Sequence, residues 1–317
     1  MMPLYFLGID GGQSSTTALI GDENGKVVGR GTAGPCNHVA AAEGRAKLIS
    51  AVAGSVASAC AAAALDPATL VFQSACLGLS GGPEDKEEII RSLLRADKIS
   101  VTNDAWIALA GATAGEPGIV VIAGTGSIAL GRRGERTARA GGWGYIFGDE
   151  GGGFDITRRA LRAALRFEEG WGPPTVLHRV LLEAAGGQNA NALLHRMYTP
   201  EFPRPAVARL SRLVDEAAAG GDAVAQSILR EAAEELGSLA LAVRKQLFAT
   251  GDPARVAYVG GVFRSAFLLD LFRAALAREG AGACVPPVYG PAAGALLEAY
   301  ALADRRVLLS QVPQEKG

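Results

Sequence analysis

The sequence predicts an α/β protein built from two domains of similar design. Its 317 residues exceed what one hydrophobic core usually organises and suit two domains of about 150 residues each. Short apolar runs alternate with longer helical patterns, as expected for sheets that are covered by helices. A strand-turn-strand-turn-strand pattern near residue 5 also returns near residue 119. We interpret this return as an internal duplication at the level of structure.

The first half begins with three predicted antiparallel strands. They cover residues 5–9, 16–21 and 26–32, and Asn24-Gly25 predicts a hairpin turn between the last two. We then expect helices and strands in alternation. In order they are helix 40–64, strand 70–79, helix 84–95 with Pro83 at its entrance, strand 98–102 and helix 105–114.

A glycine and proline cluster at residues 115–118 marks the predicted domain boundary. We expect one domain from residues 1–115 together with a returning C-terminal segment, 291–317. The other is expected at 116–290 and contains a helical insertion. Its predicted elements are strands 119–123, 127–132 and 135–140, helix 153–168, a helical region 175–250 interrupted at 199–205, strand 255–259 and helix 265–277. The last predicted element is helix 291–303, which belongs to the first domain.

Composition excludes several classes of function. A net charge of -1 without a basic cluster argues against nucleic acid as a partner. Residues 48–65 are uncharged but rich in alanine, so we expect a packed helix there and no membrane span. The four cysteines and three histidines lack metal-binding spacing, and the N-terminus lacks a signal-peptide pattern. We therefore expect a cytoplasmic enzyme with free thiols. The region 175–250 offers surface for a homodimer, although no heptad indicates one.

Two glycine-rich turns stand at matching positions of the two halves. The first is Asp10-Gly11-Gly12-Gln13-Ser14, and the second is Gly124-Thr125-Gly126-Ser127. Such turns point backbone N–H groups at an anion, and the hydroxyls add donors. A carboxylate beside a phosphate requires a cation, so Asp10 indicates Mg²⁺ bound through water. The alternative is a pair of ordinary hairpin turns. Neither turn matches a Rossmann or Walker pattern.

Asp104 follows a predicted strand and opens a predicted helix. One interpretation is a helix N-cap, a role that aspartate fills well. The other is a catalytic base that accepts the proton of an attacking hydroxyl. The carboxyl end of a strand in an open α/β sheet is where ligands bind, which favours the second interpretation.

Three further segments have residues suited to a polar ligand. Residues 141–153 hold seven glycines, Trp143 and two adjacent carboxylates, which indicates a loop that closes on a sugar; the alternative is a flexible hinge. Asn37-His38 lies in a turn, where the amide can bind a sugar hydroxyl. The stretch 259–265 predicts a strand, a diglycine turn and a helix start, where backbone can approach a nucleotide base.

Taken together, these motifs resemble the N-acetylglucosamine kinase branch of the actin/Hsp70/hexokinase superfamily, which is grouped with the BadF/BadG/BcrA/BcrD ATPases. The resemblance runs from Gly8 to about Ala303 and is most specific in Gly-Gly-Trp-Gly followed by Gly-Asp-Glu-Gly. It implies two actin-like (ribonuclease H-like) domains with a cleft between them, and transfer of phosphate from ATP to the 6-hydroxyl of N-acetylglucosamine. Relatives act on glucosamine or N-acetylmuramic acid, and both substrates stay open here.

The resemblance also implies roles for individual residues. Asp104 matches the catalytic carboxylate. The positions that match ATP and phosphate contacts are Asp10, Gly11, Gly12, Ser14, Thr125, Gly126, Ala218, Gly260, Gly261 and Ser265. Those that match sugar contacts are Asn37, His38, Asp104, Ser127, Gly142, Trp143, Gly144 and Asp149.

One departure and two rivals accompany the resemblance. The first turn reads Asp-Gly-Gly-Gln-Ser-Ser-Thr where many members have a third glycine and then threonine, and Ser14 can replace that threonine as a donor. An ATPase switch that binds a protein partner is one rival. An activator of 2-hydroxyacyl-CoA dehydratases is the other, and the cysteine contexts of this chain do not favour it.

Overall fold

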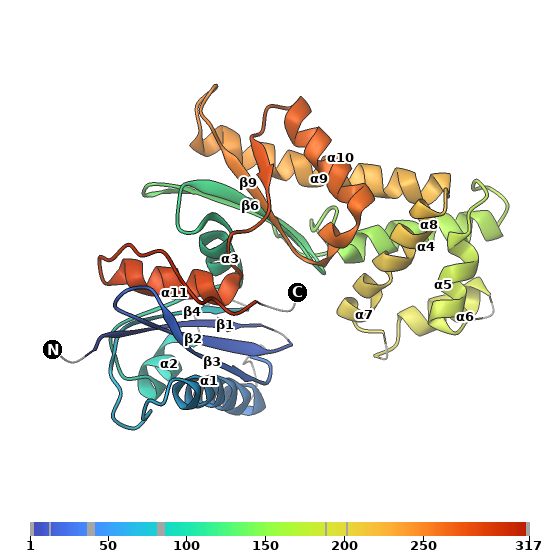
Figure 1. Cartoon of the computed structure of the whole chain (residues 1–317). Helices are drawn as coiled ribbons and strands as arrows, with labels where there is room; N and C mark the ends of the chain where they lie inside the picture. The colour runs from blue at the N-terminus through green and yellow to red at the C-terminus, as the bar shows by residue number, and fades with distance from the viewer. Residues whose placement is uncertain are drawn as a thin grey trace. The chain divides into compact units, whose positions relative to one another are not determined.

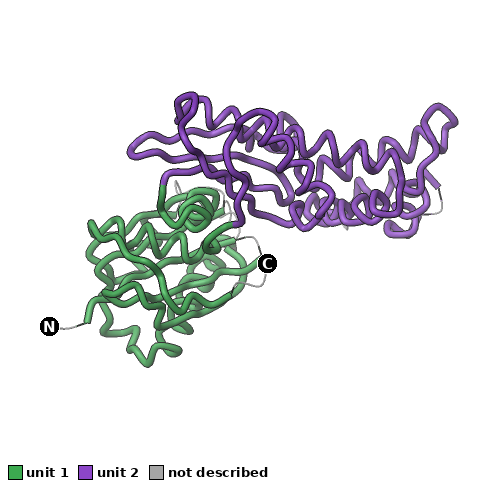
Figure 2. Tube along the Cα trace, turned by 45° about the horizontal axis from the view of Figure 1, so that its top comes forward, with its two compact units in different colours: residues 1–116, 287–316 green, residues 117–286, 317 purple. Residues whose placement is uncertain are grey.

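The computed structural model describes residues 3–12, 14–36, 42–80, 86–187, 189–200 and 202–314, with the side chains of 42 and 43 left out. Asn37, His38 and Pro83 lie outside the described residues. The chain forms two compact units, Met1–Glu116 with Pro287–Lys316 and Pro117–Pro286 (Figure 2). Each unit contains one five-stranded mixed sheet, so the α/β fold predicted from the sequence is confirmed.

The sheet of the first unit has the order β3-β2-β1-β4-β5. Its first three strands are antiparallel neighbours, whereas β4 and β5 run parallel to β1. The carboxylate of Asp22 accepts from the N–H groups of Asn24 and Lys26, at 2.9 and 3.0 Å, and so builds the predicted hairpin turn. The strands are β1 (Tyr5–Gly11), β2 (Thr16–Asp22), β3 (Val27–Ala33), β4 (Phe72–Leu79) and β5 (Ala96–Asn103).

Helices cover both faces of this sheet (Figure 1). The described helices are α1 (Ala42–Ala62), α2 (Glu87–Leu93), α3 (Asp104–Thr113) and α11 (Pro291–Leu302). α1 packs on β2 and β3, and α11 packs on β1 and β4. Small residues make this packing close: a Cβ atom at Gly8 would lie 2.2 Å from the backbone nitrogen of Leu296. Within the described residues, no helix has the length and apolarity that a bilayer crossing requires.

The sheet of the second unit has the order β10-β9-β6-β7-β8. From its hairpin edge it repeats the strand order of the first sheet, with three antiparallel strands followed by two strands parallel to the first. This match supports the predicted duplication. The strands are β6 (Gly118–Ala123), β7 (Ser127–Arg133), β8 (Arg136–Gly141), β9 (Arg255–Val259) and β10 (Ala283–Val285).

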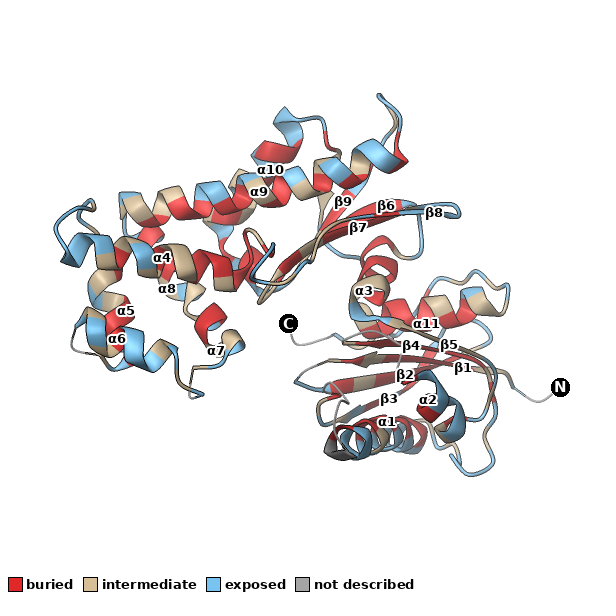
Figure 3. Cartoon of the chain, turned by 180° about the vertical axis from the view of Figure 1, so that it is seen from behind, coloured by how far each residue is buried: buried red, intermediate tan, exposed pale blue. Residues whose placement is uncertain are grey.

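A helical layer forms the rest of the second unit. Its longest helix begins at Asp222, whose carboxylate accepts from the N–H of Ala225 at 2.9 Å and caps it. Buried residues recur along α9, where it packs on β6 and β7 (Figure 3). The helices are α4 (Gly153–Glu168), α5 (Leu177–Ala185), α6 (Ala190–Met197), α7 (Arg204–Arg209), α8 (Ser211–Ala219), α9 (Ala223–Leu247) and α10 (Ala266–Arg278).

The structure corrects the sequence prediction at two kinds of position. The helical region 175–250 breaks at 186–187 and at 220–222 as well as near 199–205, and Gly186 ends α5 with a φ of 65°. The sequence also missed β10 and the 3₁₀ helix Gly261–Arg264. β10 has only three residues, which is too short for a periodic signal.

Candidate active site

The carboxyl ends of three parallel strands form one edge of the first unit's sheet. In the register of the strands, Gly11 of β1 pairs with Leu79 of β4, and Leu79 pairs with Asn103 of β5. Asp10 therefore precedes this row on β1, and Asp104 follows it on β5. Two carboxylates predicted from the sequence thus come to the sheet edge where open α/β folds bind ligands.

Asp104 is the first residue of α3 but not its N-cap. The cap is Asn103, whose side chain accepts from the N–H of Trp106 at 2.8 Å, so the N-cap interpretation of Asp104 was wrong. Asp104 is exposed, and its Oδ2 accepts from the hydroxyl of Ser80 at 2.7 Å. Its Oδ1 accepts from the N–H of Ala105 at 2.9 Å. Ser80 therefore orients the Asp104 carboxylate, and the N-cap of α3 does not depend on that carboxylate.

The first glycine-rich turn is closed by its own backbone. The N–H of Gly12 donates to the carbonyl of Ser15 at 3.0 Å, and the N–H of Cys36 donates to the carbonyl of Gly12 at 2.9 Å. The N–H of Gly12 is therefore engaged within the turn. Ser14 is exposed, so its hydroxyl is a donor that a bound phosphate could use.

A buried lysine also belongs to this edge. Lys86 is 2% exposed, and its ammonium donates to the carbonyl of Ser80, whose own N–H donates to the carbonyl of Gly11 at 3.0 Å. Burial raises the pKa of the Cys36 thiol; among the weaker influences on it, Lys86 lowers and Asp10 raises that pKa. A cation and a carboxylate therefore lie within electrostatic range of the same thiol, beside the first glycine-rich turn.

The donor set at this edge fits Mg²⁺ bound mainly through water and phosphate. Asp10 is half-buried at the end of β1. The described residues hold no cluster of three or more acidic, histidine or cysteine side chains that would form a protein cage for a metal. Mg²⁺ commonly keeps several waters and needs only one or two carboxylates together with substrate phosphates. Asp10 is the residue that would hold it.

In the second unit, the glycine-rich turn between β6 and β7 is fixed to the start of α4. The N–H of Gly153 donates to the carbonyl of Gly124 at 2.8 Å, and the N–H of Phe154 donates to the carbonyl of Thr125 at 3.0 Å. These donors belong to the first turn of α4, where no intrahelical acceptor exists. The turn and the helix start therefore form one rigid piece of backbone.

The loop rich in glycine and aromatic residues lies against this turn. Asp149 is 5% exposed, and a Cβ atom at Gly126 would lie 2.3 Å from its Oδ2. The hydroxyl of Ser127 donates to the carbonyl of Glu150 at 2.6 Å. Trp143 is 68% exposed. The structure thus brings Gly126, Ser127 and Asp149 together and leaves the indole of Trp143 accessible.

Trp143 stands between Gly142 and Gly144, two further positions of the loop that were predicted to contact a sugar. The guanidinium of Arg139 lies over its indole ring, 4.4 Å from the centroid. The same side chain donates to the carbonyl of Gly142 at 3.0 Å. An exposed aromatic face held in place in this way is a surface on which a sugar ring can stack.

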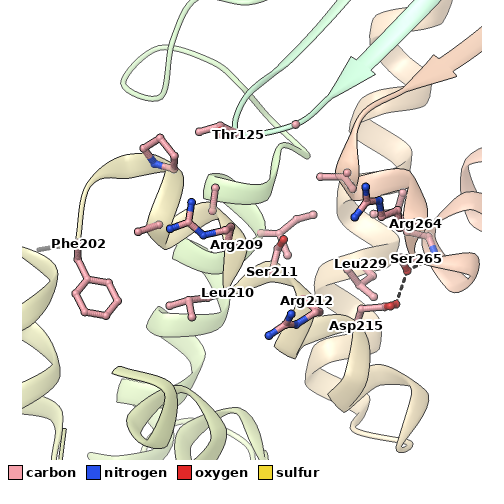
Figure 4. A pocket seen from close by; sticks show the side chains of 18 residues that line it. Thr125, Phe202, Arg209, Leu210, Ser211, Arg212, Asp215, Leu229, Arg264 and Ser265 are labelled. Atoms are coloured by element: carbon pink, nitrogen blue, oxygen red, sulfur yellow. Dashed lines mark hydrogen bonds between the residues drawn. The ribbon is translucent and has the colours of Figure 1, made fainter. Parts of the chain in front are cut away.

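A cavity of about 870 Å³ opens beside the glycine-rich turn between β6 and β7 and is lined by α7, α8 and the start of α10. Its volume lies in the range typical of small-molecule sites. Figure 4 shows Thr125 on one side of the cavity and the pair of Ser265 and Asp215 on another. Within this pair, the serine hydroxyl donates a hydrogen bond to the carboxylate. Arginines give the lining a positive excess; they are Arg209, Arg212 and Arg264.

The predicted diglycine turn lies next to this cavity. Gly260 has a φ of 113°, and a Cβ atom there would lie 2.3 Å from the carbonyl oxygen of Ala123, so only glycine fits. Gly261 and Ser265 line the cavity, and the hydroxyl of Ser265 caps α10 by accepting from a backbone N–H at 3.1 Å. Ala218 is 2% exposed and is absent from the lining. Asp215, three residues earlier on α8, faces the cavity in its place.

Several residues of these sites were missed by sequence reasoning. Each of them is positioned by a tertiary contact that no local sequence pattern predicts. For α7, the available sequence signal was a basic side chain at the proline-containing stretch 199–205. The missed residues are Lys86, Arg139, Arg204, Arg209, Arg212, Asp215 and Arg264.

Comparison with known proteins supports one family. The family model described as the BadF/BadG/BcrA/BcrD ATPase family matches residues 7–299. An N-acetylmuramic acid/N-acetylglucosamine kinase of Clostridium acetobutylicum is 37% identical over 85% of this chain and 89% of its own length. An N-acetyl-D-glucosamine kinase of Dictyostelium discoideum is 33% identical over 84% of this chain and 88% of its own.

Solved structures agree with these sequence relatives. A candidate N-acetylglucosamine kinase from Chromobacterium violaceum superposes with a TM-score of 0.76 and 29% identity, over 93% of this chain and 98% of that one. A glucokinase of the ROK family from Streptomyces griseus, solved with glucose and AMPPNP, has a TM-score of 0.54 and 19% identity, over 93% of this chain and 98% of that one. The second likeness concerns the fold alone.

Proposed function

Because the chain belongs to the BadF/BadG/BcrA/BcrD ATPase family, we propose that it is an ATP-dependent kinase of an amino sugar. Its proposed main substrate is N-acetylglucosamine, and the product is N-acetylglucosamine 6-phosphate. One observation carries the proposal: the Asp104 carboxylate is oriented by Ser80 at the strand edge that also presents the first glycine-rich turn. A base beside a phosphate-binding turn is what phosphoryl transfer to an alcohol requires.

Asp104 is the proposed catalytic base. It accepts the proton of the sugar hydroxyl as the hydroxyl oxygen forms a bond to the γ-phosphorus and the bond to the β-phosphate oxygen breaks. ADP leaves, and the proton remains on the carboxylate until solvent removes it. The hydrogen bond from Ser80 keeps the carboxylate in one orientation, which supplies the positioning on which such a reaction depends.

In each unit, taken by itself, the glycine-rich turn is a proposed phosphate contact. In the first unit, the donors are the hydroxyl of Ser14 and backbone of the turn that begins at Gly11. In the second unit, they are Thr125 and Gly126. Bound Mg²⁺ would neutralise part of the phosphate charge, and Asp10 would hold it through water. The positive cavity beside Thr125 is proposed to bind the adenosine, with Gly261 and Ser265 in its wall.

The sugar is proposed to bind at the loop 141–153 and at Asp104. Ser127, Gly142, Trp143, Gly144 and Asp149 are the candidate contacts of the second unit. Asn37 and His38 are candidate contacts of the first. Several relatives support an amino sugar as the substrate class, since their names are N-acetylmuramic acid/N-acetylglucosamine kinase, N-acetyl-D-glucosamine kinase and glucosamine kinase.

The test is an ADP-release assay on the purified chain with a panel of sugars. The panel holds N-acetylglucosamine, glucosamine, N-acetylmuramic acid, glucose and a blank without sugar. We expect ADP release to depend on sugar and to be fastest with N-acetylglucosamine. Phosphorus-coupled NMR of the product should place the phosphate on the 6-oxygen.

Two other outcomes have clear meanings. ADP release that is equal with and without every sugar contradicts the kinase proposal and favours an ATPase switch. Faster turnover of glucosamine or N-acetylmuramic acid keeps the kinase and replaces the substrate. Because these sugars differ in their substituents at positions 2 and 3, the panel isolates the contacts that set specificity.

A further inference from the structure

A partly buried ion pair fixes the carboxylate of Asp149 in the loop 141–153. Arg204, the first residue of α7, donates from Nη2 to Oδ2 of Asp149 at 2.9 Å. The side chain of Asp149 is 7% exposed, and that of Arg204 is 37% exposed. The two residues are 55 positions apart in sequence, so the pair joins two separate segments of the second unit.

The guanidinium of Arg204 is held on a second side. It lies over the ring of Tyr145, 5.2 Å from the centroid, and this ring packs edge-on against Phe154 at 5.3 Å. Its Nε–H is buried and has no hydrogen-bond partner within the described part of the chain. Buried donors are paired in the great majority of cases, so this N–H is a donor that the described protein atoms leave without an acceptor.

Asp149 itself is held in an unusual backbone conformation. Its φ is 64°, which non-glycine residues rarely adopt and which is enriched at ligand-binding sites. Arg204 engages Oδ2, no described residue donates a hydrogen bond to Oδ1, and the side chain as a whole is 7% exposed. One carboxylate oxygen is therefore fixed by the protein, and the other can accept from a ligand hydroxyl.

The same arginine begins a helix that forms the wall of the cavity. Pro205, Ala206, Ala208 and Arg209 of α7 all line the cavity beside Thr125. Asp149 lies directly against Gly126 of the adjoining turn. α7 therefore supplies both part of the cavity wall and the arginine that pairs with Asp149.

We propose that Arg204 is a positioning residue: it holds Asp149 ready to accept a hydroxyl of the sugar and links that carboxylate to the nucleotide cavity through α7. This inference rests on the proposed kinase function. It assigns no contact between Arg204 and either substrate. Removing the guanidinium should free Asp149 to rotate, and the loss should appear in sugar binding.

The test is a double-mutant cycle on the full chain with Arg204→Gln, Asp149→Asn and the double variant. We expect Arg204→Gln to raise the KM for N-acetylglucosamine by at least about tenfold, the low end for a hydrogen bond between charged groups. The KM for ATP should change less than about threefold. The double variant should be no worse than Asp149→Asn alone, because Arg204 acts through Asp149. Arg179→Gln is the matched control, since Arg179 forms an exposed pair with Glu183 on α5.

Each other outcome decides against a stated claim. If the effects of the two single variants multiply, or if the KM values of both substrates rise equally, Arg204 has a general structural role and the inference is wrong. A wild-type chain that phosphorylates no sugar overturns the proposed function and this inference with it. Should the Gln variant not fold, Arg204→Lys carries the test, because it keeps the charge that pairs with Asp149 and loses the planar guanidinium. A sugar KM close to that of the wild type, with an intact fold, is the expected result, and a loss of ATP affinity alone refutes the proposal.

Discussion

Asp104→Asn is the substitution that most directly tests the proposed chemistry. The structure indicates that it removes little else. An asparagine keeps an oxygen that can accept from the N–H of Ala105, and its amide can donate to Ser80, whose hydroxyl also accepts. The cap of α3 is supplied by Asn103 and is untouched. The variant should therefore fold as the wild type does.

The expected effect can be worked out in two parts. A general base contributes about 10²- to 10⁴-fold to the rate, so kcat should fall by at least about a hundredfold, or about 2.7 kcal/mol. Losing one negative charge in the first turn of α3 costs about 0.3–1 kcal/mol of helix stabilisation. The loss in activity thus exceeds the loss in stability, and the sugar KM should change less than kcat.

The assay is ADP release at saturating sugar and ATP, with thermal unfolding measured on the same samples. Asp97→Asn is a matched control because Asp97 lies near the opposite end of β5, is exposed and accepts a hydrogen bond from Gln73 at 3.2 Å. Its kcat should stay within about twofold. If Asp104→Asn keeps kcat within a few-fold of wild type, Asp104 is not the base. Equal losses in both variants would show an effect on the fold.

Three further predictions concern the second unit and the core. Gly260→Ala should destabilise the protein by about 1–3 kcal/mol, because Gly260 has a positive φ and a Cβ atom there would meet Ala123. Gly261→Ala has open space around it, so it should change stability by less than about 0.5 kcal/mol and mainly raise the KM for ATP. Equal melting temperatures of the two variants would contradict this prediction. Ser265→Ala should cost about 1 kcal/mol through the lost cap of α10 and weaken ATP binding, as calorimetry can measure. Burial raises the pKa of the Cys76 thiol from 9.0 to about 12, so its contribution to stability is present below pH 9 and is lost as the pH rises toward 12. Denaturant unfolding should therefore show wild type losing about 1 kcal/mol more than Cys76→Ser between pH 8 and pH 10, and parallel pH profiles would refute this.

The sequence predicted the elements of both sheets well because their signals are local. Strand 255–259 and helix 153–168 have the limits that were expected. Turn residues such as Asn24-Gly25 and the short apolar run of β1 act over a few residues and need no tertiary context. The repeat of the strand order followed from the repeat of these local signals.

Candidate site residues could be named from the sequence only where a local pattern is recognisable. Asp104 stands at a strand-to-helix junction and Thr125 in a glycine-rich turn, and the structure places the first beside Ser80 and the second in the cavity wall. Lys86 and Arg204 were not predicted. Lys86 contacts the carbonyl of Ser80 from a buried position, and Arg204 pairs with Asp149, which is distant in sequence. The identity of the N-cap was also out of reach, because Asn103 and Asp104 are both good caps and the strand length decides between them.

The position of α11 has a consequence for biosynthesis. A Cβ atom at Gly294 of this helix would lie 1.9 Å from the carbonyl oxygen of Ile107, so α11 and α3 interlock over a sheet whose first strand is synthesised long before α11. The apolar side chains of Phe6, Cys76 and Ile107 are buried with those of α11. A nascent chain that has reached residue 290 therefore carries an unfinished first core. A stalled chain released there should bind a hydrophobic dye and aggregate, whereas one released after residue 314 should not.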